Sequence, residues 1–179
     1  FYTASPAAVG AHFSAKLDLV LAANPWMLAT VSKDGKSFDF PKVYDATTHR
    51  SKVLNILAPE AADFNRSSSY EEINASIVMK HSVDAGKRLK GNPSKLISKL
   101  SIIPVTGNSQ ECAVVFSLSH LVGDGYTYFT LLNMFGASNP VIAMDCKRVG
   151  GSKMSSPVER RMCTDAVQDY ADSVGFIKH

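Results

Sequence analysis

The sequence predicts an α+β fold in which a mixed, mostly antiparallel sheet carries helices packed on one face. Two observations lead to this prediction. Strand-like runs follow one another directly at 99–105 and 111–120, with only a short turn between them. Segments with helical spacing of apolar residues lie at 11–23, 70–79, 126–135 and 157–174, without the regular strand–helix alternation of a parallel α/β winding.

The composition is that of a globular protein with a substantial core. Of the 179 residues, 45% are hydrophobic and 20% are charged. The net charge of +3 gives no argument for nucleic-acid binding, and no apolar run is long enough for a transmembrane segment. Cys112, Cys146 and Cys163 are odd in number and have no CxxC spacing. They predict neither a zinc site nor a disulfide framework, and an intracellular reducing compartment is favoured.

The first half of the chain begins with a helix at 11–23, whose apolar positions include Phe13 and Leu17 and which Asn24-Pro25 should end. Two β-rich runs, 26–32 and 37–44, flank the hairpin turn Asp34-Gly35. A further short strand is expected at 52–57.

A capping box at Ser69–Glu72 should open the next helix and bury Ile73, Ile77 and Val78. Residues 80–99 are rich in lysine and arginine and contain a single acid, Asp84. This segment is interpreted as a solvated loop or a frayed helix, with an anionic ligand or acidic partner as the alternative.

The strands at 99–105 and 111–120 should pair through the turn at 106–109. Alternation places one set of residues of the second strand on a common face: Cys112, Val114, Phe116, Leu118 and His120. The helix at 126–135 should end at Gly136, and a second capping box at Ser156 should open the helix at 157–174.

His120 stands at the end of this apolar strand in the stretch SLSHLVGDGYTYF, which leaves three interpretations: a core residue, a metal ligand or a general base. The other histidines show no metal-ligand spacing, so no metal site is predicted. Burial at a strand end would keep the imidazole neutral and well oriented, as a base requires. Asp124 would orient the turn, and Gly125 would let a ligand or another backbone approach closely.

The segment 120–125, His-Leu-Val-Gly-Asp-Gly, resembles the HxxxDG motif of the coenzyme A-dependent acyltransferase superfamily. That superfamily includes chloramphenicol acetyltransferase, plant BAHD acyltransferases and peptide-synthetase condensation domains. The resemblance implies that residues 1–179 form a single chloramphenicol-acetyltransferase-like lobe, similar to the N-terminal lobe of a longer two-lobe protein. Only the six-residue motif is specific.

The same resemblance implies residue roles. His120 would be the catalytic base that takes a proton from an acceptor hydroxyl or amine, Asp124 would be structural, and Gly125 would leave room near the donor channel. The family pairs this aspartate with an arginine, which the sequence does not identify here. The implied co-substrate is a coenzyme A or carrier thioester, with no permanently bound cofactor.

Three functions remain open at this stage: an HxxxDG-type acyltransferase, a non-catalytic subunit or scaffold with the same fold, and an unrelated α+β binding module. The expected partners are a small-molecule acyl acceptor and either a second lobe or other protein chains that cover the sheet. His120 should lie beside a crevice or interface, with Asp124 turned away from it. Loss of a buried, charged Asp124 should cost about 3 to 5 kcal/mol.

Overall fold

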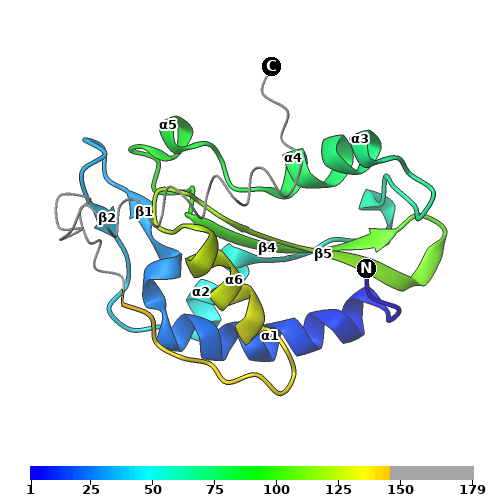
Figure 1. Ribbon diagram of the computed structural model, residues 1–179, viewed down its shortest axis with the longest axis horizontal. Coiled ribbons are helices and arrows are strands. Elements are labelled where there is room, and N and C mark those ends of the chain that lie inside the picture. The colour runs from blue at the N-terminus through cyan, green and yellow to red at the C-terminus, as the bar shows by residue number, and fades with distance from the viewer. Residues whose placement is uncertain (146–179) are drawn as a thin grey trace, which may run out of the picture. The chain divides into compact units, whose positions relative to one another are not determined.

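A computed structural model describes residues 1–145 (Figure 1). The predicted helix at 157–174 and its capping box at Ser156 lie outside the described residues. Within them, helices and two small sheets are mixed, and the sheets contain both parallel and antiparallel pairs. The α+β class is therefore confirmed.

The larger sheet has the strand order β3-β4-β5. β4 (Ser98–Val105) and β5 (Asn108–Leu118) are antiparallel, with Ser101 opposite Val115, as the sequence predicts. Gly107 makes the turn between them with a φ of 76°, a value that glycine reaches without steric cost. β3 (Leu54–Ile56) lies parallel to β4 on its other side.

Helix α1 (Pro6–Ala23) begins five residues earlier than predicted, because the Ser5 side chain caps it and Pro6 stands in its first turn. It ends at Asn24, as predicted. The buried Asn24 amide donates to the carbonyl groups of Val20 and Ile142, and its oxygen accepts from the Met144 amide. Asn24 thus joins the end of α1 to the chain that follows α6.

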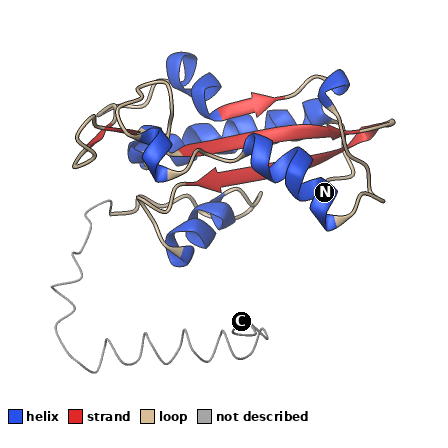
Figure 2. Cartoon of the chain, turned by 90° about the horizontal axis from the view of Figure 1, so that it is seen from above, coloured by secondary structure: helices blue, strands red, loops and turns tan. Residues whose placement is uncertain are grey.

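One face of the larger sheet packs against α1 and α6 (Gly125–Met134). Figure 1 shows α1 beneath the strands, and Figure 2 shows helices on either side of the red strands. The buried side chains of this core include Phe13, Leu17, Leu100, Ile102, Phe116 and Leu131. Burial of each such side chain contributes about 1.5 to 3 kcal/mol.

The other face carries a second, smaller core made of Phe64, Ile77, Ile103, Val105 and Ala113. Ile77 belongs to a continuous helical segment: α3 (Tyr70–Ile73), the π-helical turn η3 (Asn74–Val78) and α4 (Met79–His81). The prediction of helices on one face is therefore wrong. The second face of β4 is apolar at Ile103 and Val105, so it requires cover there as well.

The helical segment from 70 to 81 starts at the predicted capping box, in which the Ser69 hydroxyl accepts from the Glu72 amide and the Glu72 carboxylate accepts from the Ser69 amide. Ile77 is buried and Ile73 is partly buried, as expected. Val78 is 40% exposed, which corrects its assignment to the core. The π-helical turn shifts the helix register, which explains this miss.

The smaller sheet is the predicted hairpin, but it is short. β1 (Thr30–Val31) pairs with β2 (Phe38–Asp39) around Gly35. Pro25 opens a 3₁₀ turn, η1 (Pro25–Leu28), where a strand was expected. α2 (Ala46–Val53) was not predicted; the Asp45 carboxylate caps it, and it takes over the first two residues of the expected strand at 52–57.

Two further short helical elements are the 3₁₀ turn η2 (Pro59–Ala61) and helix α5 (Gly86–Leu89). Isolated bridges join Tyr2 to Cys112 and Val31 to Lys90. Leu89 and Ile97 are fully buried. The basic segment 80–99 is therefore anchored to the core at two points, which a wholly solvated loop would not be.

Candidate functional site

His120 lies in the turn that joins β5 to α6. β5 ends at Leu118, and the next residue, Ser119, is buried and donates its backbone amide to the Ile97 carbonyl at 2.8 Å. The Ser119 hydroxyl then accepts the Leu121 amide at 3.3 Å, and the Ser119 carbonyl accepts the Val122 amide at 3.1 Å. The chain turns at this point, so His120 follows a firmly held residue.

The His120 side chain is exposed. The prediction that it would share the buried face of β5 is wrong, because the strand ends two residues before it. Within the described part of the chain, the imidazole makes no hydrogen bond and no ion pair, so it remains accessible to a ligand.

Asp124 is the N-cap of α6. Its Oδ1 accepts hydrogen bonds from the Thr127 amide and the Thr127 hydroxyl, both at 3.0 Å. These two bonds hold the pKa of the Asp124 carboxyl below its ordinary value. Asp124 is exposed, so the expectation of a buried charge worth 3 to 5 kcal/mol is corrected to the smaller effect of a helix cap.

The two glycines of the motif have different surroundings. A Cβ atom at Gly123 would lie 2.6 Å from Cγ2 and 2.7 Å from Cβ of Thr127. A Cβ atom at Gly125 would meet no described atom within 4 Å. Gly123 is therefore required by the cap itself, a role that the sequence analysis missed. The space beside Gly125 is open, as a spacer position would need.

Helix α6 is fixed to β5 by its inward side. The Tyr128 hydroxyl donates to the Phe116 carbonyl at 3.1 Å, and the two rings stack with centroids 5.4 Å apart. Leu131 and Met134 are buried in the same core. The turn that carries His120 is thus supported by a strand before it and a packed helix after it.

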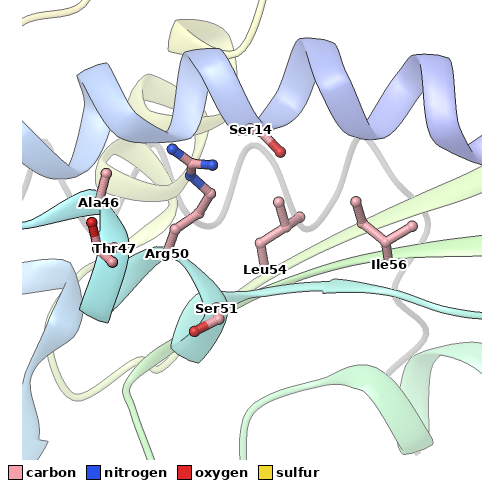
Figure 3. A pocket seen from close by; sticks show the side chains of 7 residues that line it. All are labelled: Ser14, Ala46, Thr47, Arg50, Ser51, Leu54 and Ile56. Carbon is pink, nitrogen blue, oxygen red and sulfur yellow. The ribbon is translucent and has the colours of Figure 1, made fainter.

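Two hollows in the described part of the chain lie away from His120. The larger, of about 510 Å³, is formed by α1, α2 and β3 (Figure 3). Its lining residues are Ser14, Ala46, Thr47, Arg50, Ser51, Leu54 and Ile56. The smaller hollow lies near Lys52 and Lys99. His120 lines neither of them, so the crevice expected beside it is not provided by these hollows.

Arg50 at the edge of the larger hollow points toward α1 in Figure 3, and its partner is Asp18. Arg50 donates to both carboxylate oxygens, at 2.7 and 2.5 Å, and the Tyr44 hydroxyl donates to Oδ1 at 2.5 Å. Burial alone would raise the pKa of Asp18, but the bonds from Arg50 and Tyr44 outweigh it and lower that pKa. Burial, and then the bond to Asp18, raise the pKa of Tyr44 to about 12.

This network answers the question of an arginine partner for Asp124. Arg50 is committed to Asp18, and the described residues give Asp124 no ion pair. The sequence analysis missed the network because Asp18 and Arg50 lie 32 positions apart. The sequence feature that could have indicated the network is Asp18, a single carboxylate in the mostly apolar helix α1.

No match emerged when the chain was compared with protein-family models, curated proteins and solved structures. Among residues 1–145, no helix has the length and apolarity needed to cross a membrane. The same residues contain no group of three or more histidine, cysteine, aspartate or glutamate side chains that could hold a metal ion.

Proposed function

We propose that this protein is an acyltransferase of the HxxxDG type, with His120 as its general base. The observation that carries the proposal is the position of His120: an accessible imidazole on a turn that is fixed on one side by Ser119 and on the other by the Asp124 cap. A base must be accessible to its substrate and held in place, and this turn provides both conditions.

In the proposed reaction, His120 takes a proton from the hydroxyl or amine of a small acceptor. The acceptor oxygen or nitrogen attacks the thioester carbonyl of a coenzyme A or carrier-bound acyl group. The carbon–sulfur bond breaks, and the imidazolium returns its proton to the departing thiolate. General-base catalysis of this kind contributes about 10² to 10⁴-fold in rate. Asp124 acts as a positioning residue, and Gly125 leaves space for the donor.

A second lobe or a partner chain would complete the site around His120 in this proposal. The outward side of α6 supports this. Tyr126 is 78% exposed, Phe129 is 67% exposed and Leu132 is 39% exposed, and all three lie next to the motif on one side of the helix. Exposed apolar side chains that share one side of a helix are typical of a protein contact.

The test is an acyl-transfer assay with acetyl-coenzyme A and a panel of small alcohols and amines, followed by release of the free thiol. His120→Ala should abolish turnover and leave the melting temperature unchanged, because the side chain is exposed. His49→Ala, at a histidine of α2 away from the motif, is the matched control and should keep full activity. Equal turnover in the native protein and His120→Ala would refute the base assignment.

The second candidate function is a non-catalytic subunit or scaffold of a larger assembly. The observation that favours it is the apolar outward side of α6, where Tyr126 is 78% exposed and Phe129 is 67% exposed. It predicts no turnover with any thioester, even when the protein is assayed within its native assembly. Turnover that depends on His120 excludes this alternative.

A further inference from the structure

The second face of the larger sheet changes character along its length. At one end, Ile103, Val105 and Ala113 form the smaller core with Ile77. Toward the other end, the same face of β4 and β5 carries Lys99 opposite Ser117, and Ser101 opposite Val115. A sheet face that is apolar at one end and carries a lysine and serines at the other is not explained by core packing alone.

A polar pocket of about 190 Å³ occupies this second end. Its walls come from α2, β3, the 82–84 segment, the 94–96 segment and the start of β4. The side chains that can bind a ligand there are Lys52, Asn55, Ser82, Ser94, Lys95 and Lys99. We call this hollow, defined by these residues, the polar pocket.

The charges around the polar pocket do not balance. Lys95 is paired with Asp84 at 2.9 Å, and the described residues provide no ion pair for Lys52 or Lys99. Lys99 is half-buried on the central strand of the sheet, and Lys52 is exposed at the edge of the pocket. Asp63 does not compensate, because it is paired with Lys80.

A neighbouring histidine responds to the same excess of positive charge. The pKa of His81 is lowered, first by its burial and then by the charge of Lys99, and these effects outweigh the opposing charge of Asp63. Two unpaired ammonium groups beside hydroxyl and amide donors form a site that attracts an anion. Lysine contributes to such sites as a strongly hydrated point charge, which suits a phosphate group.

Size restricts the ligand further. Pockets for drug-sized ligands and coenzymes measure about 300 to 1,000 Å³, so the polar pocket is too small for a whole nucleotide coenzyme. The walls contain three lysines and one carboxylate, Asp84, which is paired with Lys95. Lys52, Lys99 and several neutral donors remain, and a phosphate group fits that chemistry. We propose that the polar pocket binds a phosphate group, either free or as the terminal group of a small phosphomonoester, through Lys52 and Lys99. This site does not depend on the acyl-transfer proposal.

Isothermal titration of the full chain with inorganic phosphate, at constant low ionic strength, tests the site. Lys52→Gln and Lys99→Gln should each weaken binding about tenfold, and the double variant should abolish it. Lys36→Gln, which removes the same charge from the β1–β2 hairpin turn, is the matched control and should bind like the native protein. Circular dichroism melts establish that each variant is folded.

Glycerol 3-phosphate is a second probe, and glycerol, which has no phosphate group, is its control. Tighter binding of glycerol 3-phosphate than of inorganic phosphate identifies the ligand as a phosphomonoester, and the reverse order identifies free phosphate. Unchanged binding in folded Lys52→Gln and Lys99→Gln would overturn the proposal. An equal loss in Lys36→Gln would also overturn it, because the effect would then come from net charge and not from the pocket.

Discussion

Asp124 Oδ1 accepts two hydrogen bonds from Thr127, one from its backbone amide and one from its hydroxyl, each 3.0 Å long. This pairing closes the first turn of α6 directly after the turn that carries His120. It gives the aspartate of the motif a structural purpose that requires no arginine. The position of His120 therefore depends on a local cap and not on a distant ion pair.

The Asp124 cap predicts an order of stability for the native protein, Asp124→Asn and Asp124→Ala. Asp124→Ala should lower the free energy of unfolding by about 1 kcal/mol, because it leaves the Thr127 amide without its acceptor. Asp124→Asn should lose less, since an amide oxygen can accept the same bond. Urea denaturation of the three proteins measures this order. A loss of several kcal/mol in Asp124→Ala would indicate a buried partner instead of a cap.

The same cap should depend on pH in a defined direction. The pKa of Asp124 is lowered in the folded protein, so its stabilising contribution is present above the ordinary value of 3.8 and is lost as the pH falls below it. The stability difference between the native protein and Asp124→Ala should therefore shrink on acidification. Asp124→Asn provides the control, because it has no carboxyl group at this position.

The two glycines of the motif allow a matched comparison. Gly123→Ala should destabilise the protein by about 1 to 3 kcal/mol, because the new methyl group would overlap the Thr127 side chain. Gly125→Ala should leave stability unchanged or raise it by up to about 1 kcal/mol, since the space is open and alanine favours helix. Thermal melts distinguish the two.

The KM for the thioester tests the proposed role of Gly125. If Gly125 is the spacer for an acyl donor, Gly125→Ala should raise the KM for the thioester in a protein that melts like the native one. An unchanged KM would leave Gly125 as an ordinary helix residue and would remove the spacer role.

Local patterns were the part of the fold that could be predicted from the sequence. The β4–β5 hairpin follows from two apolar runs around Gly107, and the capping box at Ser69–Glu72 lies where its residues indicate. These features depend on residues a few positions apart. The exposed state of His120 depends on Ser119 bonding to Ile97, a long-range contact that alternation along one strand does not contain.

Longer-range features required the structure. β3 pairs with β4 across more than forty residues, and the short apolar run at 54–56 does not indicate a parallel neighbour. Ile103 and Ala113 show that the second face needs cover, but they do not show that the helical segment around Ile77 supplies it. The polar pocket likewise brings Lys52 and Lys99 together from separate elements.

Tyr44 should ionise at an unusually high pH. Burial and its bond to Asp18 raise the pKa of Tyr44 to about 12, so its stabilising contribution should persist at neutral pH and disappear as the pH rises through that value. A spectrophotometric titration of the tyrosines should show this ionisation at high pH. It should be missing in Tyr44→Phe and should move to lower pH in Asp18→Asn, where the carboxylate is gone. A titration that is the same in all three proteins would contradict the network.

The outward side of α6 predicts that the protein does not remain an isolated monomer. Burial of an aromatic side chain such as Phe129, which is 67% exposed, is worth about 1.5 to 3 kcal/mol, and Tyr126 beside it adds to the gain. Sedimentation equilibrium of the 179-residue chain should therefore give a mass above that of the monomer.

Phe129→Glu should lower this mass. Val43→Glu, at an apolar side chain that is 77% exposed elsewhere on the surface, should not change it. A soluble monomer with a cooperative melt would show that the chain needs no second lobe or partner chain at α6, and the proposed completion of the site around His120 would then fail.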